Sequence, residues 1–221
     1  MNTRHSTAAI ILAAGSSSRM GGGRHKLLLP LDGRPVLVHV IDAALASQAQ
    51  PIIIVLGHEA GKVRAHITAF TSHPGIIIVE NDKYLQGMST SMYLGLRTLI
   101  SNGYKKGGSS FAVDSALIML GDQPMITSRV IDTLISVYRA KGKHIVAPLY
   151  GGKRGNPVLF DMSLFPELLE VTGDEGGRAV LERHPQDLEL VEMSDALANY
   201  DVDTWEAYQQ LLEAWEHKGK E

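Results

Sequence analysis

A segment rich in glycine, serine and positive charge follows the first apolar run of the chain. In the stretch LAAGSSSRMGGGRHKLLLP, residues 12–30, the cations Arg19 and Lys26 stand among four glycines. Glycines let a backbone approach a ligand and turn its N–H groups inward as an anion nest, while Arg and Lys neutralise phosphate oxygens. The segment therefore predicts a polyphosphate site, although a solvated Gly/Ser loop with incidental cations stays open. The glycines are Gly15, Gly21, Gly22 and Gly23.

Two aspartates far apart in the sequence form the next candidate group. Asp122 follows the apolar run 116–120, and Asp203 lies in an Asp-Val-Asp sequence just before Thr204, a candidate helix cap. If both lie at the carboxyl edge of one sheet, they supply the hard oxygen ligands that Mg²⁺ or Mn²⁺ prefers, with substrate phosphates and water completing the shell. The alternative is that each aspartate only caps a helix or forms a turn.

Hydroxyl and cationic residues beside glycines supply further candidates. Ser89 and Ser91 open an amphipathic segment, where they could contact a nucleotide or only cap the helix. Arg154 and Asn156 lie in a Gly-flanked loop, and Arg178 follows two glycines. Arginine forks suit a phosphate and asparagine can read the amide edge of a ring, but exposed arginines are usually only solvated.

The elements that must position these residues alternate along the chain. Short, nearly continuous apolar runs are typical of strands buried on both faces, and the segments between them have helical spacing with Thr127 as an N-cap. This predicts an α/β fold: a doubly wound, mostly parallel, Rossmann-like sheet in three α/β/α layers. A shorter strand over 158–160 and helices over 164–170 and 204–217 complete the prediction. The strand runs are 9–13, 52–56, 76–79, 116–120 and 145–148, and the helical segments are 35–47, 88–100 and 127–140.

Composition limits the classes of partner. With 21 Lys+Arg against 24 Asp+Glu in 221 residues, the net charge of −3 argues against binding to nucleic acid or to anionic lipid. The chain has no cysteine, which excludes disulfides and thiolate sites and favours the cytoplasm. The run after Arg4 is too short for a membrane span and reads better as a buried strand than as a signal peptide. We expect one domain, with a nucleotide-binding half of about 1–125 and an acceptor-binding half of about 126–221.

The order Leu-Ala-Ala-Gly-x-Ser-x-Arg-Met-Gly, followed by Lys-Leu-Leu-Leu-Pro, resembles the signature of the MobA-like nucleotidyltransferase superfamily. Within it the chain is most similar to the molybdenum cofactor cytidylyltransferase (MocA) family, along nearly its whole length. The pieces that match are Asn81-Asp82, Gly87-Met88-Ser89-Thr90-Ser91, Gly121-Asp122-Gln123-Pro124, Arg154-Gly155-Asn156-Pro157, Gly173-Asp174-Glu175-Gly176-Gly177-Arg178 and Asp201-Val202-Asp203-Thr204.

The resemblance implies transfer of CMP from CTP to the phosphate of molybdenum-bound molybdopterin, with release of pyrophosphate and with Mg²⁺ (or Mn²⁺) as cofactor. It implies that Lys26, Arg19 and Asp122 are catalytic and that Asp122 and Asp203 are the metal ligands. Alanine at position 14, where guanylyl-transferring relatives carry glycine, favours a pyrimidine base. The implied nucleotide-binding residues are Leu12, Ala13, Ala14, Gly15, Ser16, Arg19, Lys26, Ser89 and Ser91, and the implied acceptor-binding residues are Gln123, Arg154, Asn156, Asp174 and Arg178.

Other functions stay open at this point. A sugar-phosphate or polyol-phosphate nucleotidyltransferase, or one that uses GTP, would need the same loop and carboxylates. A carrier of the finished cofactor, delivering it to an apo molybdenum hydroxylase, is the non-catalytic alternative, which retention of both aspartates and Lys26 disfavours. The glycine-rich segment 102–110 is a candidate lid, and deletion of 105–109 would then raise the Michaelis constant.

Overall fold

The computed structural model describes residues 4–102 and 111–218. Its main sheet has the strand order β10-β7-β9-β6-β1-β4-β5, with β8 paired to β7. The pairs β1–β4, β1–β6, β4–β5 and β7–β10 are parallel, and β9 runs antiparallel to both β6 and β7. The strands of this sheet are β1 (Arg4–Ala13), β4 (Ile52–Leu56), β5 (Ile76–Glu80), β6 (Phe111–Leu120), β7 (Ile145–Tyr150), β8 (Lys153–Arg154), β9 (Val158–Asp161) and β10 (Leu188–Met193). The short strands β2 (Pro30–Leu31) and β3 (Arg34–Pro35) form a separate antiparallel pair.

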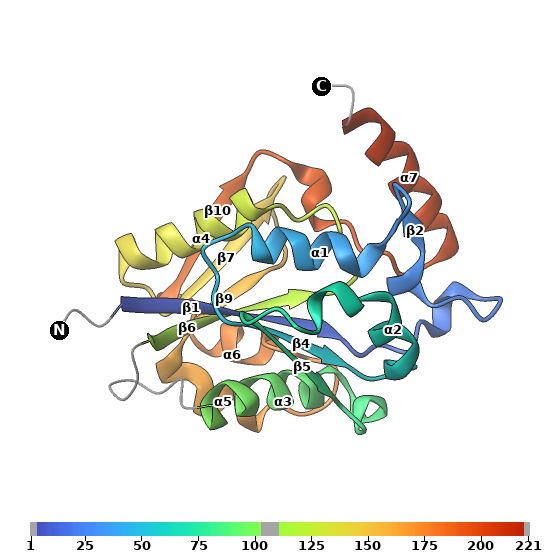
Figure 1. The fold of residues 1–221 in the computed structure, drawn as a ribbon. Coiled ribbons are helices and arrows are strands. Elements are labelled where there is room, and N and C mark those ends of the chain that lie inside the picture. Colours follow the sequence, from blue (N-terminus) through green and yellow to red (C-terminus); the bar gives the residue numbers. More distant parts are fainter. Residues whose placement is uncertain (1–3, 103–110, 219–221) are drawn as a thin grey trace.

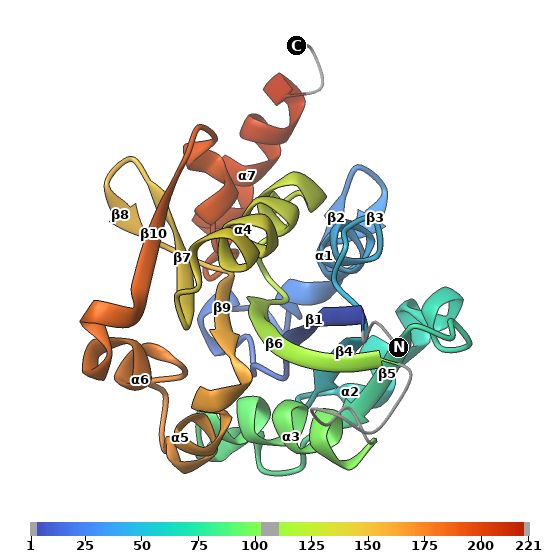
Figure 2. The ribbon, with the colours of Figure 1, turned by 90° about the vertical axis from the view of Figure 1, so that its left-hand side faces the viewer.

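Helices cover both faces of this sheet (Figures 1 and 2). One core lies between the sheet and α1, α2 and α4, and a second lies between the opposite face and α3, α5 and α6. Every residue of β4 is buried, which fits its unbroken Ile-Ile-Ile-Val-Leu sequence. The mostly parallel three-layer fold expected from the sequence is confirmed. The helices are α1 (Val36–Leu45), α2 (Ala60–His66), α3 (Met88–Ser101), α4 (Ser128–Lys141), α5 (Phe165–Glu170), α6 (Arg178–Arg183) and α7 (Trp205–Lys218).

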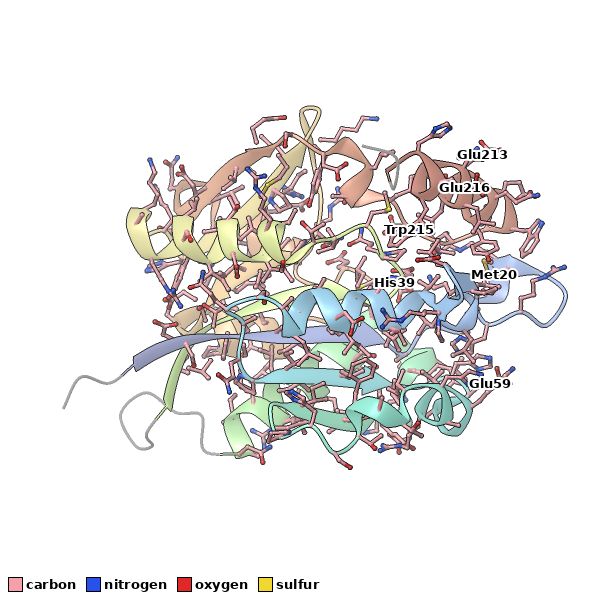
Figure 3. The ribbon with its side chains drawn as sticks, turned by 45° about the horizontal axis from the view of Figure 1, so that its top comes forward. Met20, His39, Glu59, Glu213, Trp215 and Glu216 are labelled. Carbon is pink, nitrogen blue, oxygen red and sulfur yellow. The ribbon has the colours of Figure 1, made fainter. Side chains whose placement is uncertain are left out.

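The helix α7 closes the edge of the molecule beside the glycine-rich loop. Tyr208 and Leu211 of α7 are buried in a third cluster that includes Met20 of the loop. At the outer end of α7, the ring of Trp215 meets the ring of His39 from α1 edge-on, 4.8 Å apart (Figure 3). This cluster packs the glycine-rich loop against the C-terminal helix α7 and fixes the position of the loop.

The segment 150–157 departs from the prediction of a plain loop. Lys153–Arg154 forms β8 and pairs antiparallel with β7. Gly151 and Gly152 have φ of 57° and 78°, the left-handed conformation that a two-residue hairpin turn requires and that glycine adopts without strain. Because only residues 151–157 separate β7 from β9, no crossover can form, and β9 must return antiparallel.

Among the expected elements, each predicted strand and helix has a counterpart, and the Thr127 side chain caps α4 by accepting a hydrogen bond from the Val130 N–H. The strand β10 and the short helices α2 and α6 were not predicted. The candidate lid falls almost entirely on residues 103–110, outside the described residues, and stays a prediction. Among residues 4–102 and 111–218, no helix is long and apolar enough to cross a membrane.

Candidate active site

The glycine-rich loop and Asp122 meet because β1 and β6 are neighbours in the sheet. Leu12 pairs with Leu120, and the Gly121 N–H donates to the Leu12 carbonyl over 2.9 Å. A Cβ on Gly121 would lie 3.1 Å from the Cβ of Ala13, so glycine permits this close approach of the two strand ends. The carboxyl ends of adjacent parallel strands are where open α/β sheets bind ligands.

The loop itself is folded. Ser17 adopts a left-handed conformation with φ of 55°, and its hydroxyl accepts a hydrogen bond from the Lys26 backbone N–H at 3.1 Å. A short helical turn, Ser18–Met20, buries Met20, and the following glycines all have positive φ. The hydrogen bond to Ser17 and the burial of Met20 hold the loop in one conformation at the edge of the sheet.

A cleft of about 640 Å³ lies over these strand ends. Its volume falls in the range of small-molecule sites. The predicted nucleotide-binding residues line it except Ser89, which is buried and gives its backbone N–H to the Gly173 carbonyl. The lining residues are Leu12, Ala13, Ala14, Gly15, Ser16, Ser17, Ser18, Arg19, Lys26, Leu27, Tyr84, Leu85, Gly87, Met88, Ser91, Leu120, Asp122, Asp174, Asp201 and Asp203.

Lys26 connects the two predicted metal ligands. Its Nζ bonds to Asp122 Oδ2 and lies 2.8 Å from Asp203 Oδ1, and Arg19 Nη2 lies 3.1 Å from Asp203 Oδ2. Burial would lower the pKa of Lys26, but the charges and hydrogen bonds of both carboxylates outweigh it and raise that pKa. Burial likewise opposes ionisation of Asp203, yet Lys26 and Arg19 lower its pKa below the ordinary value. The two cations expected to face phosphate therefore neutralise carboxylates in this structure.

Asp201 is a further acidic group in the cleft, beside Asp122, Asp174 and Asp203, and sequence reasoning missed it. Its pKa is raised to about 6, first by desolvation of its carboxyl group and then by the negative charge of Asp122. The Val202 N–H donates to the Asp122 carbonyl at 3.0 Å, which holds this segment beside the end of β6. The signal was present in the Asp-Val-Asp motif, of which only the second aspartate was assigned.

The site fits a divalent cation in donor chemistry. Asp122 and Asp203 offer hard carboxylate oxygens, and both already contact one cation, the ammonium group of Lys26. Among the described residues, no group of three His, Asp or Glu side chains is arranged to hold a metal ion. Two carboxylates with substrate and water oxygens are the set that Mg²⁺ commonly uses.

The predicted acceptor residues lie in several places. Asp174 lines the cleft and its carboxylate accepts the Met88 N–H at 2.9 Å. Arg154 is exposed on β8, and the exposed Arg178 pairs with Glu182 at 2.7 Å. Neither arginine belongs to the cleft lining.

The amide residues predicted on the acceptor side lie deeper in the structure. Gln123 is buried, with 1% of its surface exposed, and donates to Asp201 at 2.6 Å. Asn156 gives its backbone N–H to Asn199 Oδ1 at 3.2 Å. Neither residue lines the cleft.

The rim of the cleft at Leu85 and Met88 is apolar; Met88 belongs to the predicted segment 87–91, whereas Leu85 was not identified from the sequence. Leu85 is 79% exposed and Met88 is 38% exposed, both at the lining. Ser91, also at the lining, accepts a hydrogen bond from the buried Asn81 side chain at 2.9 Å, which orients its hydroxyl. Single exposed apolar residues are common on protein surfaces, so the sequence alone carried no signal for Leu85.

A glycine-rich, cationic loop at the edge of a doubly wound sheet, facing a pair of carboxylates, is the arrangement expected of a nucleotidyltransferase. The chain belongs to the MobA-like NTP transferase domain family, which matches residues 9–188. It is 29% identical over 211 residues to nicotine blue oxidoreductase of Paenarthrobacter nicotinovorans, covering 92% of this chain and 95% of that protein. It is also 29% identical over 137 residues to the bifunctional protein GlmU of Anaeromyxobacter sp. (strain K), covering 62% of this chain but only 26% of GlmU.

Solved structures agree with this assignment. Rv0371c from Mycobacterium tuberculosis H37Rv has a TM-score of 0.76 and 28% identity, over 96% of this chain and all of that one. A complex of Rv0371C with manganese matches with a TM-score of 0.70 and 27% identity, over 95% of this chain and 99% of that one. A nucleotidyl transferase from Methanothermobacter thermautotroptrophicus shares the fold, with a TM-score of 0.79 and 24% identity over 97% of this chain and 100% of that one.

Proposed function

We propose that this chain transfers CMP from CTP to the phosphate of molybdenum-bound molybdopterin, giving molybdopterin cytosine dinucleotide and pyrophosphate. The observation that carries the proposal is the convergence of the glycine-rich loop, Lys26, Asp122 and Asp203 on one cleft. The resemblance to the MocA family supplies the acceptor and the base. In this proposal the chain is a single domain whose halves, about 1–125 and 126–221, bind nucleotide and acceptor.

The reaction needs little covalent chemistry from the protein. A phosphate monoester oxygen of the acceptor attacks the α-phosphorus of CTP, a new P–O bond forms, and the bond to the β-phosphate breaks to release pyrophosphate. A phosphate monoester is already anionic at neutral pH, so no strong general base is required. The protein's task is to position the reactants in line and to stabilise charge.

The cations of the loop can pair either with the carboxylates of the cleft or with the phosphates of a nucleotide. In the proposed complex, Lys26 and Arg19 turn from Asp122 and Asp203 to the β- and γ-phosphates, where they stabilise the leaving pyrophosphate. Loop N–H groups near Gly15 contact the same phosphates. Mg²⁺ or Mn²⁺, held by Asp122 and Asp203, would supply positive charge at the α-phosphate. The manganese complex of Rv0371C supports the use of a divalent ion.

The base and the acceptor face different parts of the cleft in this proposal. The Ala14 methyl group, at the lining, reduces the room beneath the base and favours cytosine over a purine. Ser91 and the apolar rim at Leu85 lie within reach of the base and ribose, while Asp174, Arg154 and Arg178 serve the acceptor side.

A second candidate function follows from the name of one relative. Nicotine blue oxidoreductase is similar to this chain over nearly its full length, so a redox reaction in the same cleft is a competing proposal. The two proposals differ in their products, because a transferase releases pyrophosphate whereas an oxidoreductase changes the redox state of a substrate and consumes no CTP.

The deciding experiment measures pyrophosphate release by the purified protein with Mg²⁺ and molybdenum-loaded molybdopterin, with CTP, GTP, ATP and UTP in separate reactions. Release with CTP alone is the expected result. Release with GTP alone would move the proposal to a guanylyltransferase. If no nucleotide is consumed, oxidation of a reduced nicotinamide in the presence of a dye acceptor would favour the redox proposal, and tight pterin binding without any turnover would favour a carrier.

A further inference from the structure

A side chain outside the family motifs connects the acceptor side to the carboxylates. Asn199 ends a short helical turn, Ala196–Asn199, just before the Asp-Val-Asp segment. Its Oδ1 accepts the backbone N–H of Asn156 at 3.2 Å. The amide nitrogen of Gln123 lies 3.5 Å from the same oxygen and donates to Asp201 at 2.6 Å. A continuous polar path therefore runs from the 151–157 connection to the acidic end of the cleft.

The 151–157 connection is closely packed at Gly155. A Cβ on Gly155 would lie 2.2 Å from Asn199 Oδ1 and 2.7 Å from a ring carbon of Tyr150, so no larger residue fits there. The Tyr150 hydroxyl donates to the Asn156 carbonyl at 2.9 Å, and the Gly155 N–H donates to the Pro148 carbonyl at 3.1 Å. The connection is thus fixed from the side of β7 and from the side of Asn199.

The burial of Gln123 indicates what its amide group does. Its Oε1 is buried and has no hydrogen-bond partner among the described residues. Burying an amide oxygen without a partner is unfavourable, so an apolar residue would be cheaper if the position served packing alone. The amide of Gln123 therefore stabilises this site through its NH₂ group, which donates to Asp201 and faces the Oδ1 of Asn199.

We propose that Asn199, together with Gln123, is a positioning residue that fixes the 151–157 connection, which carries Arg154 and Asn156, relative to the carboxylates of the cleft. The inference rests on the proposed function, because it assigns the acceptor to that connection. Since Asn199 does not line the cleft, it acts through Asn156 and Gln123. Its loss should weaken acceptor binding and spare CTP binding.

The test compares steady-state kinetics of Asn199→Ala, Asn199→Asp and wild-type protein, varying molybdopterin and CTP separately. We expect Asn199→Ala to raise KM for the acceptor about tenfold, the effect of losing one or two neutral hydrogen bonds, with kcat and KM for CTP within about twofold. Asn199→Asp keeps an oxygen at the Oδ1 position, so it should recover most of the acceptor affinity. Gln48→Ala removes an exposed amide whose Oε1 accepts a hydrogen bond from Arg139, far from any predicted site residue, and serves as the matched control with wild-type kinetics.

A second readout does not depend on turnover. Amide hydrogen exchange at Asn156 should be slow in wild-type protein and clearly faster in Asn199→Ala, and a shared melting temperature would show that both proteins are folded. Equal exchange in the two proteins, or an equal rise in both KM values, would overturn the positioning role. If Asn199→Ala does not fold, Gln123→Met takes its place with the same expectations. If wild-type protein releases no pyrophosphate from any nucleotide, the proposed function fails, and the exchange experiment alone decides whether Asn199 holds the connection.

Discussion

The nucleotide-facing loop and the acceptor-facing segments of the proposed active site differ in how the chain builds them. The loop between Leu12 and Lys26 is continuous in sequence, and its predicted residues line the cleft together. The acceptor side draws on β8, the turn before α6 and the end of β6, and of its predicted residues only Asp174 lines the cleft. A local motif carries its own geometry, whereas residues from separate elements depend on the whole fold for theirs.

The difference also appears in the partners of the charged groups. In the loop, Lys26 and Arg19 pair with acidic residues from distant elements, Asp122 and Asp203. In the proposed complex, phosphate therefore replaces these carboxylates as the partner of both cations. On the acceptor side, Arg178 pairs with its helical neighbour Glu182 on the surface. Exposed pairs of this kind contribute little to stability, so that arginine is readily available to a ligand.

The largest expected loss of activity comes from Asp122, which lies between the nucleotide-facing loop and the acceptor-facing segments. Asp122→Asn keeps the size of the side chain but removes the charge that holds Lys26 and the expected metal ion. We expect the rate of pyrophosphate release to fall about 10²-fold or more, as is typical when an electrostatic stabiliser is removed. The matched control is Asp42→Asn, which removes a surface carboxylate paired with Arg34 and should leave the rate within about twofold. Equal rates in all three proteins would remove Asp122 from the mechanism.

The next effect isolates the nucleotide side. A Cβ on Gly15 would meet no protein atom within 4 Å, so Gly15→Ala should fold normally while placing a methyl group in the cleft. We expect KM for CTP to rise about tenfold, the usual scale of a small steric intrusion, with KM for the acceptor unchanged. Gly61→Ala, in α2, also meets open space and should raise the free energy of unfolding by about 0.5–1 kcal/mol without a kinetic effect. An unchanged KM for CTP in Gly15→Ala would place the nucleotide elsewhere.

A smaller effect isolates the acceptor side. Arg154→Ala and Arg178→Ala should each raise KM for molybdopterin about fivefold, the scale of an exposed charged contact, and leave KM for CTP unchanged. Arg139→Ala is the matched control, since Arg139 is exposed on α4 and bonds to Gln48. If the two acceptor-side variants behave like the control, the arginines are only solvated, and Asp174 is the one predicted acceptor residue in the cleft that is left to contact the acceptor.

Much of the fold could be predicted from the sequence, because parallel strands buried on both faces appear as continuous apolar runs. The strand Ile52–Leu56 is buried throughout and was predicted with the same bounds. β10 was missed because its LELVEM sequence is neither a continuous apolar run nor a strict alternation of apolar and polar residues, and at the edge of the sheet only its last residue is buried. β8 was missed because two residues and a glycine turn give no periodic signal.

The candidate site was predictable to the extent that it is local. Leu12 to Lys26 was identified as one unit, and the strand pairing that brings Asp122 beside it follows from the predicted sheet. The ion pair between Lys26 and Asp203 spans the chain and could not be read from spacing. Asn199 was missed for the same reason, because its importance lies in a contact with Asn156 that only the tertiary structure brings about.

The smallest kinetic effect belongs to the scaffold beneath the acceptor side. The Tyr138 hydroxyl of α4 donates to Asp161 Oδ2 at 2.5 Å, at the end of β9. Burial opposes ionisation of Asp161, but hydrogen bonds from Ser163 and Tyr138 outweigh it and lower the pKa of Asp161 below its ordinary value. We expect Tyr138→Phe to lower the free energy of unfolding by about 1–2 kcal/mol at pH 7, the scale of a hydrogen bond to a charged group, with unchanged kinetics.

The pH dependence of that loss follows from the direction of the shift. A carboxyl whose folded-state pKa is depressed stabilises the protein above its unfolded pKa of about 3.9, and this stabilisation disappears as the pH falls through the folded-state pKa. The difference between wild-type protein and Tyr138→Phe, measured by urea unfolding, should therefore be largest near neutrality and narrow below about pH 4. Tyr93→Phe, at a position that is 46% exposed on α3, should show no difference at any pH. A gap that stays constant down to pH 3 would mean that the bond to the Asp161 carboxylate contributes nothing and that Tyr138 stabilises the protein through contacts that do not titrate, such as its hydroxyl's 3.3 Å bond to the Asp114 backbone carbonyl.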